Sequence, residues 1–302
     1  MKPGLIISFK GSLHYLLDQE TGQIYPVELS GKARYLQQNL YVGDLVNFSL
    51  LNQQVQINSI LPRKNKLNRP NIANIDHLII VASAINPPFS FDLLDRFLIN
   101  SSFYDLEKSL IITKIDLLTP KELEQLKESL TYYRDQLHLH IYYESSKKPQ
   151  DYLADEDFLN SKNIIKCFSF PINALSGQSG VGKTTLLNKL APEQIRKTQE
   201  VSSALQRGKN TTSHYELSKI SATNTYICDT PGFLNLDINY LEADQLKNYY
   251  PDFINNTCRY GNSCTHTVEP ECSVIKDQLS GKISQIRYNN YVKLYQYLKE
   301  KK

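Results

Sequence analysis

Residues 177–185 read GQSGVGKTT, a glycine-rich stretch between the apolar run FPINAL and the helix-like LLNKL. Glycines let a chain fold closely around phosphates with its N–H groups pointing inward, and the N-terminus of a following helix adds positive potential. We expect Lys183 to reach the β- and γ-phosphates of a nucleotide and the Thr184 hydroxyl to bind Mg²⁺. A glycine-rich turn that only resembles this pattern is the alternative. The predicted phosphate contacts are Gly177, Gln178, Ser179, Gly180, Val181, Gly182, Lys183, Thr184 and Thr185.

A second phosphate-related signal is DTPG at residues 229–232, after the strand-like TYIC. In nucleotide hydrolases an acidic residue at a strand end holds Mg²⁺, and a following glycine amide responds to the γ-phosphate. Alone, the tetrapeptide is an ordinary turn. Because DTPG lies about 50 residues after a phosphate loop, it predicts a switch segment that responds to the γ-phosphate. We therefore expect Asp229 and Gly232 to act in catalysis together with Lys183 and Thr184.

TKID at residues 113–116 follows the strand-like SLII and offers a carboxylate for base recognition. Asp116 can accept hydrogen bonds from N1–H and the exocyclic amine of guanine, which adenine cannot donate from matching positions. The stem of Lys114 can cover the base plane, and SSK at 145–147 can place backbone amides against the guanine oxygen. A polar loop without a ligand is the alternative. The predicted base contacts are Thr113, Lys114, Ile115, Asp116, Ser145, Ser146 and Lys147.

The order of these motifs is unusual. Most GTPases present the phosphate loop first, then DxxG, then the guanine motif, whereas here residues 113–116 precede residues 177–185. If both motifs belong to one site, the order of the segments along the chain is circularly permuted, whereas the arrangement of the strands in the sheet is unchanged. Domain ends often lie close together at the surface, so permutation is tolerated. The segment after DTPG is then tethered directly to the γ-phosphate switch.

Three kinds of sequence pattern follow one another along the chain, and together they predict a multidomain α/β protein. Up to about residue 65, five short β-prone runs predict a small barrel. An OB-like barrel is the simplest interpretation, because it closes a sheet with few residues. A purely structural barrel with no ligand is the alternative. From residue 75, buried strands alternate with amphipathic helices, which predicts a parallel sheet covered on both faces. The remainder is helical around a Cys/His cluster. The expected domains are an OB-fold domain at 1–68, a permuted GTPase domain at 69–236 and a zinc-binding domain at 237–302.

The cluster CRYGNSCTHTVEPEC spans residues 258–272. Three thiolates and one imidazole make a closed tetrahedral set with no open position for water, as structural Zn²⁺ requires. Reduced thiols in an ordinary helical domain are the alternative. Two further cysteines, Cys167 and Cys228, sit singly in apolar runs and are expected to be small buried hydrophobes. The predicted zinc ligands are Cys258, Cys264, His266 and Cys272.

Composition is ordinary for a globular protein, with 41% hydrophobic and 22% charged residues, and it argues against disorder or a fibrous architecture. No stretch approaches the roughly 20 apolar residues of a membrane span. The start MKPGLIISFKG is too short and mixed for a secretory signal. The expected location is therefore the cytoplasm, with no membrane partner.

The net charge of +3 is unevenly distributed. Residues 1–70 carry eight Lys and Arg against four Asp and Glu, and residues 258–302 carry the same numbers, which leaves the middle acidic. Basic ends on an acidic centre indicate that the flanks meet a polyanion. Solvated charge without a partner explains the same pattern equally well.

The order TKID, SSK, GQSGVGKTT, GKNTTS, DTPG and Cys/His cluster resembles the bacterial ribosome small-subunit-dependent GTPase A family, also called YjeQ or RsgA. The resemblance covers nearly the whole chain, including RPNIANIDHLIIV and GKISQIRYNNY. It implies an OB-fold, a permuted GTPase domain and a zinc domain that act in late maturation of the 30S subunit. The implied ligands and partners are GTP and GDP with Mg²⁺, one structural Zn²⁺, the 30S subunit and its 16S rRNA, and the expected state is a monomer.

This sequence departs from the family pattern at several positions. The guanine motif usually opens with Asn, where Thr113 keeps a hydroxyl but loses the amide. The switch segment usually reads Gly-Arg-His-Thr-Thr, and here Asn210 replaces the histidine, so it can bind water but cannot act as a base near neutral pH. His214 lies close by and is a possible substitute. Thr212 is the first candidate, and Thr211 the second, for the residue whose hydroxyl binds Mg²⁺ together with that of Thr184.

Phe233 follows DTPG, where many small GTPases have a Gln that orients water. A phenyl ring cannot do so, and a missing group of this kind costs on the order of 10³ to 10⁵ in rate. We therefore expect slow intrinsic hydrolysis that a partner completes. Three functions stay open: a GTP-dependent assembly factor on ribosomal RNA, a GTPase switch for a protein partner without RNA contact, and a non-hydrolysing zinc and RNA adaptor. The presence of Lys183, Thr184 and Asp229 disfavours the third.

Overall fold

The computed structural model describes most of the chain, in two compact units. The first unit comprises Met1–Val81 and Leu159–Phe233, and the second comprises Ala82–Phe158 and Leu234–Lys302. Predicted site residues Ser146, Thr212 and Gly232 lie outside the described residues, as do Asn210, Thr211, His214 and Phe233. The described residues are 1–10, 13–27, 40–51, 54–68, 71–145, 147, 149–152, 155–159, 166–190, 216–220, 225–229, 238–254 and 258–301.

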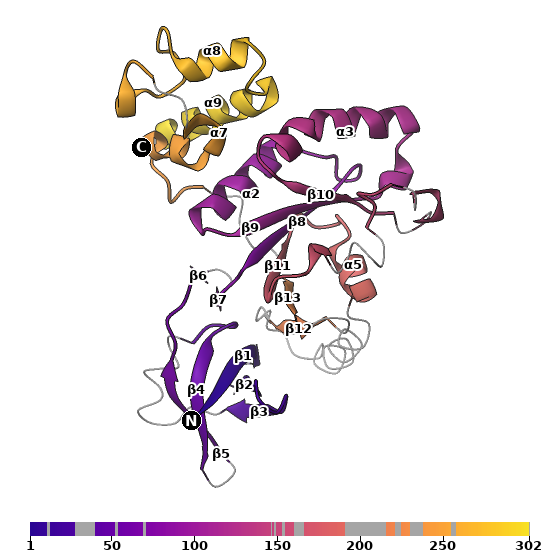
Figure 1. Cartoon of the computed structure of the whole chain (residues 1–302), viewed down its shortest axis with the longest axis vertical. Helices are drawn as coiled ribbons and strands as arrows, with labels where there is room; N and C mark the ends of the chain where they lie inside the picture. Colours follow the sequence, from indigo (N-terminus) through magenta and orange to yellow (C-terminus); the bar gives the residue numbers. More distant parts are fainter. Residues whose placement is uncertain are drawn as a thin grey trace. The chain divides into compact units, whose positions relative to one another are not determined.

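The N-terminal segment forms a five-stranded antiparallel sheet in the order β3-β2-β1-β4-β5 (Figure 1). Alternate residues face a small core that includes Ile6, Leu16 and Phe48, because successive side chains of a strand point to opposite faces. The five strands expected from the sequence are confirmed. They are β1 (Lys2–Lys10), β2 (Leu13–Asp18), β3 (Ile24–Val27), β4 (Leu45–Leu51) and β5 (Gln54–Ile60).

The segment that follows, PRKNKLNRPN at residues 62–71, has the charges and prolines typical of a basic surface linker, but it is not a plain linker. It folds into a hairpin of β6 (Lys66–Asn68) and β7 (Asn71–Ala73). Arg63 binds the fully buried Asp44 through two hydrogen bonds of 2.6 and 2.8 Å, with its guanidinium 4.3 Å from the ring centroid of Tyr41. Because a buried carboxylate needs a partner, this cation is used inside the fold.

The phosphate-loop side of the molecule is a four-strand stretch of sheet in the order β8-β11-β13-β12. The first three strands run parallel and β12 is antiparallel, as edge strands of such sheets often are. All five residues of β11 are buried, which explains its unbroken apolar run. The elements are β8 (His77–Ser83), β11 (Ile172–Ser176), α5 (Lys183–Leu190), β12 (Leu217–Lys219) and β13 (Tyr226–Asp229).

The second unit contains the expected alternation of strands and helices around the parallel pair β9 and β10. Ser90 caps the N-terminus of α2, and Thr119 with Glu122 forms a capping box before α3. The elements are α2 (Phe91–Phe103), β9 (Glu107–Thr113), η1 (Ile115–Leu117), α3 (Pro120–Asp135), β10 (His140–Tyr143) and η2 (Pro149–Tyr152).

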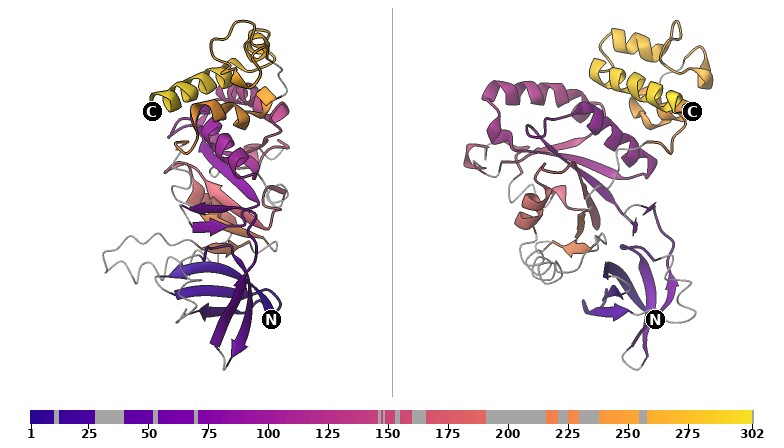
Figure 2. Two further views of the ribbon diagram at one scale, coloured as in Figure 1. Left: turned by 90° about the vertical axis from the view of Figure 1, so that its left-hand side faces the viewer. Right: turned by 180° about the vertical axis from the view of Figure 1, so that it is seen from behind.

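The C-terminal part of the second unit is helical, as expected. Its last helix, α9, lies beside α2 and η3, in a position that both views of Figure 2 also show. Tyr250, Phe253 and Tyr291 form its aromatic core. Within the described ranges, no helix combines the length and apolarity needed to cross a bilayer. The elements are η3 (Ala243–Tyr249), α7 (Pro251–Ile254), η4 (Gly261–Ser263), α8 (Ser273–Leu279) and α9 (Gln285–Glu300).

Candidate nucleotide site and metal centre

The glycine-rich loop connects the end of β11 to the start of α5, the strand-loop-helix arrangement that its sequence predicts. Gly180 and Gly182 have φ of +80° and +95°, which residues with a Cβ rarely adopt. The Lys183 ammonium donates to the carbonyls of Gly177 at 2.6 Å and Gln178 at 2.7 Å. The lysine therefore curls over the loop, with a positive charge beside its backbone.

Gly177 is required by a close approach of two backbones. A Cβ at this position would lie 2.1 Å from the Val81 carbonyl oxygen of β8, a separation that no real Cβ contact allows. The loop can start this close to β8 only because the residue has no side chain. Val181 is buried, whereas Thr184 and Thr185 are exposed in the first turn of α5.

The start of DTPG lies at the same edge of the sheet as the phosphate loop. Asp229 is the last residue of β13, and in the parallel register it is the partner of Leu175, two residues before Gly177. Carboxyl ends of parallel strands meet at one edge, where α/β folds bind ligands. Two of the three predicted nucleotide motifs thus converge within the first unit.

The predicted base-recognition residues converge within the second unit. Thr113 ends β9, Lys114 adopts a left-handed conformation with φ of 59°, and Ile115 is fully buried. The Ser145 hydroxyl, just after β10, donates to Asp116 Oδ1 at 2.9 Å. This bond fixes the carboxylate and joins TKID to the SSK segment, whose Lys147 is exposed.

A segment that the sequence patterns did not single out holds the base loop in place. The Thr113 hydroxyl donates to the Ala82 carbonyl at 3.3 Å, and the Ala84 N–H donates to the Thr113 carbonyl at 3.0 Å. The Lys114 ammonium donates to the Asn86 carbonyl. The hydroxyl that Thr113 keeps where the family has Asn is therefore used to brace the loop. Contacts to backbone carbonyls carry no residue-type signature, so sequence patterns could not reveal them.

The four predicted metal ligands lie together, with their ligand atoms all within 4.8 Å of one another. Cys272 Sγ is 3.6 Å from Cys258 Sγ and 3.7 Å from Cys264 Sγ, and His266 Nδ1 is 3.2 Å from Cys272 Sγ and 3.5 Å from Cys258 Sγ. Ligands about 2.3 Å from a tetrahedral Zn²⁺ lie about 3.8 Å apart. The donor set and its spacing therefore fit one zinc ion.

The surroundings favour the metal-binding form of two of the four ligands, His266 and Cys258. Burial lowers the pKa of His266, so its imidazole is neutral and keeps a lone pair for coordination. Burial opposes ionisation of Cys258, but hydrogen bonds from Ser273, at 3.0 Å from Sγ, outweigh it and lower the pKa of that thiol. The hydroxyls of Tyr288 and Tyr291 donate to the carbonyls of His266 and Thr265, at 3.0 and 2.6 Å. These supporting residues were not identified from the sequence.

The remaining cysteines behave as expected from their apolar surroundings. Cys167 and Cys228 are 1% and 0% exposed. Burial raises the pKa of the Cys167 thiol, which makes it unreactive. Neither belongs to the metal cluster.

The profile of one protein family, described as RsgA GTPase, matches residues 60–239. The chain belongs to the RsgA GTPase family. The match includes all three nucleotide motifs, and the resemblance seen in the motif order is confirmed.

Relatives of the RsgA family align along the whole chain. The "Small ribosomal subunit biogenesis GTPase RsgA" of Onion yellows phytoplasma is 38% identical over 314 residues, covering 99% of this chain and 98% of that protein. The protein of the same name from Staphylococcus aureus (strain MRSA252) is 37% identical over 307 residues, covering 100% and 99%.

Solved structures agree in fold with this RsgA-family chain. YjeQ from Thermotoga maritima superposes with a TM-score of 0.81 at 31% identity, covering 98% of each chain. YloQ, described as a circularly permuted GTPase, gives a TM-score of 0.80 at 31% identity, covering 100% of this chain and 96% of that one. The permuted fold expected from the order of the motifs is thus confirmed.

Proposed function

We propose that this protein hydrolyses GTP to GDP and phosphate and acts in small ribosomal subunit biogenesis. The observation that carries the proposal is the phosphate loop, with Lys183 over its carbonyls, in a chain of the RsgA GTPase family that also presents a fixed Asp116 carboxylate. The names of full-length relatives support the ribosomal role and disfavour a GTPase switch for a protein partner without RNA contact.

We propose that one guanine nucleotide is bound by the residues of the three predicted motifs. Asp116 would accept from N1–H and the exocyclic amine, Lys183 would bind the β- and γ-phosphates, and Thr184 with Thr212 would hold Mg²⁺. Asp229 would hold the same ion through water. Gly232 would respond to the γ-phosphate. Support comes from the convergence of each motif set within its own unit.

We further propose one structural Zn²⁺ on Cys258, Cys264, His266 and Cys272, where three thiolates and an imidazole leave no position for a catalytic water. The N-terminal sheet would be an OB-type barrel that, with the zinc segment, contacts 16S rRNA of the 30S subunit. The proposed domains are 1–68, 69–236 and 237–302. The protein would act in the cytoplasm as a monomer.

GTP turnover with and without purified 30S subunits tests this function. We expect slow turnover alone, a large rise with 30S subunits, and Mg²⁺ dependence. Lys183→Ala should abolish both activities, whereas Lys121→Ala, which removes an exposed lysine from α3, should change neither. Turnover that ignores 30S subunits would refute the ribosomal role, and activity retained by Lys183→Ala would refute the assignment of the phosphate loop.

A further inference from the structure

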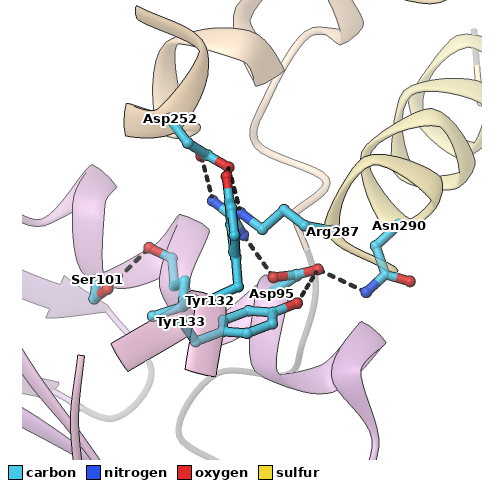
Figure 3. Close-up of polar contacts among 8 residues, drawn as sticks. Asp95, Ser101, Tyr132, Tyr133, Asp252, Arg287 and Asn290 are labelled. Atoms are coloured by element: carbon cyan, nitrogen blue, oxygen red, sulfur yellow. Dashed lines mark hydrogen bonds and ion pairs between the residues drawn. The ribbon is translucent and has the colours of Figure 1, made fainter. Parts of the chain in front are cut away.

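The second unit contains a buried ion network that the nucleotide and metal sites do not require. Arg287 of α9 and Asp95 of α2 are both 0% exposed, and Arg287 Nη1 lies 2.5 Å from Asp95 Oδ1. The other side of the guanidinium makes two 3.1 Å bonds to the carboxylate of Asp252, in α7 (Figure 3). One cation thus joins two carboxylates from different helices.

The network is closed by hydrogen bonds from three further residues. Asn290 Nδ2 donates to Asp95 Oδ2 at 2.6 Å, and the Tyr133 hydroxyl of α3 donates to the same oxygen at 3.3 Å. The Tyr132 hydroxyl donates to Asp252 at 3.0 Å. Burial opposes the charge on Arg287, but the attraction of its two carboxylates outweighs this and raises its pKa, so it stays charged. A charge held this way fixes α9 against α2 and α3 in one geometry.

The network continues through α2 to the base loop. Asp95 lies on the second turn of α2, and the segment 82–90 leads directly into that helix. This segment carries the carbonyls of Ala82 and Asn86 that hold Thr113 and Lys114. The route from Arg287 to the guanine motif therefore consists of one ion pair, the first turns of α2, the segment 82–90 and three hydrogen bonds.

A row of aromatic rings runs alongside the same route. The Phe89 ring meets Phe91 edge-on with centroids 5.0 Å apart, and Phe91 packs on Tyr133 at 5.5 Å. Tyr133 is the residue that donates to Asp95. Packed rings of this kind resist independent movement, so a shift at Asp95 would reach the segment 82–90 by two connections.

We propose that Arg287, on the C-terminal helix, is a positioning residue for guanine recognition. It fixes α2 through Asp95, and α2 fixes the segment that holds Lys114 and Thr113 in the orientation that the base requires. The helices that follow the zinc cluster thereby act on the base end of the nucleotide site. The inference rests on the proposed function, since it assigns the base to Asp116 and Lys114.

The test compares GDP with IDP, whose base lacks the exocyclic amine. Both nucleotides carry the same phosphates, and unfolding of a fraction of the protein lowers the two apparent affinities equally. The ratio of their Kd values therefore reports base positioning alone. In full-length, zinc-loaded protein, we expect Arg287→Lys and Arg287→Met to reduce the preference for GDP over IDP by about five- to tenfold, a typical coupling between distant sites.

Two controls make the result decisive. Arg134→Met breaks an exposed ion pair with Asp135 on α3, next to Tyr133, and should leave the ratio unchanged. In a Lys114→Met background, Arg287→Met should have a smaller effect on the ratio of Kd values than in the wild type. Both substitutions disturb the position of the Lys114 side chain at the base, so their effects should not add. An unchanged ratio in the Arg287 variants, with lowered thermal stability, would overturn the proposal and leave Arg287 purely structural. If the wild type fails to bind GDP, the proposed function itself is wrong.

Discussion

If Asp116 accepts the guanine donors as proposed, Asp116→Asn is expected to shift the preference from guanine towards xanthine nucleotides. An Asn amide can donate to the C2 carbonyl of xanthine but cannot accept both guanine donors. The loss of two charge-assisted hydrogen bonds should lower GTP affinity by about 100-fold or more. A competition assay between GTP and XTP measures the change. Unaltered selectivity would remove Asp116 from the base site.

Gly177 tests whether the phosphate loop works in the position described. Gly177→Ala would place a Cβ 2.1 Å from the Val81 carbonyl, so the loop must move away from β8. Displacing phosphate contacts by about 1 Å costs roughly 100-fold in rate, and we expect that loss in GTP turnover.

Gly22→Ala is the matched control for this change. Gly177 and Gly22 both have positive φ, of +158° and +73°, but no atom lies within 4 Å of a Cβ added to Gly22. The two substitutions therefore share backbone strain and differ in steric clash. Equal loss of turnover in both variants would show that strain, not the approach to Val81, explains the effect.

Residue type explains which site residues the sequence could reveal. Binding of phosphates and of a guanine base requires particular chemical groups, glycine, lysine and carboxylate, so Lys183 and Asp116 could be proposed directly from the sequence. Asn86 acts through its carbonyl, which every residue has, and could not be identified. Arg287 left a partial signal, since it lies on the same helix face as the buried Tyr291, Leu294 and Leu298. A charged residue within an apolar stripe predicts a buried partner, but not that the partner is Asp95.

At the scale of elements, alternation of apolar residues was enough to predict the strands and helices around the site. Composition was misleading for PRKNKLNRPN at residues 62–71, where charge and proline indicated a surface linker, whereas β6 pairs with β7. The buried Asp44 that binds Arg63 lies 19 residues away in sequence, so no local pattern contains the information. An ion pair between residues far apart in sequence can therefore give a segment a structure that its own composition does not predict.

The junction of α2, α7 and α9 is expected to be costly to break. Arg287→Met leaves the carboxylates of Asp95 and Asp252 buried without their cation, which should lower the free energy of unfolding by about 3–5 kcal/mol. Arg134→Met, at an exposed pair, should cost less than about 1 kcal/mol. Urea unfolding followed by circular dichroism compares the two. If adding Asp95→Asn and Asp252→Asn to Arg287→Met restored no stability, uncompensated charge would not be the cause.

At the scale of the whole chain, permutation places a short helical segment after the nucleotide fold, and segments this small often depend on a bound metal as well as on a hydrophobic core. Its cluster draws ligands from 15 consecutive positions, and its loop is anchored on α9 by Tyr288 and Tyr291. Small segments of this kind take much of their folding free energy from the metal. Zinc should therefore stabilise α9, and through Arg287 the base loop as well.

Removal of zinc by a chelator should loosen the C-terminal segment while the phosphate loop persists. The chain contains no Trp and 20 Tyr, so near-ultraviolet circular dichroism reports tyrosines such as Tyr291 without interference from indole. We expect one zinc per chain, a loss of this signal on chelation, and the same loss in Cys264→Ala but not in Cys167→Ala, where the thiol lies outside the cluster. Because the segment would release Arg287, chelation should also lower the preference for GDP over IDP. Chelated protein with an intact signal would contradict the structural role of the metal.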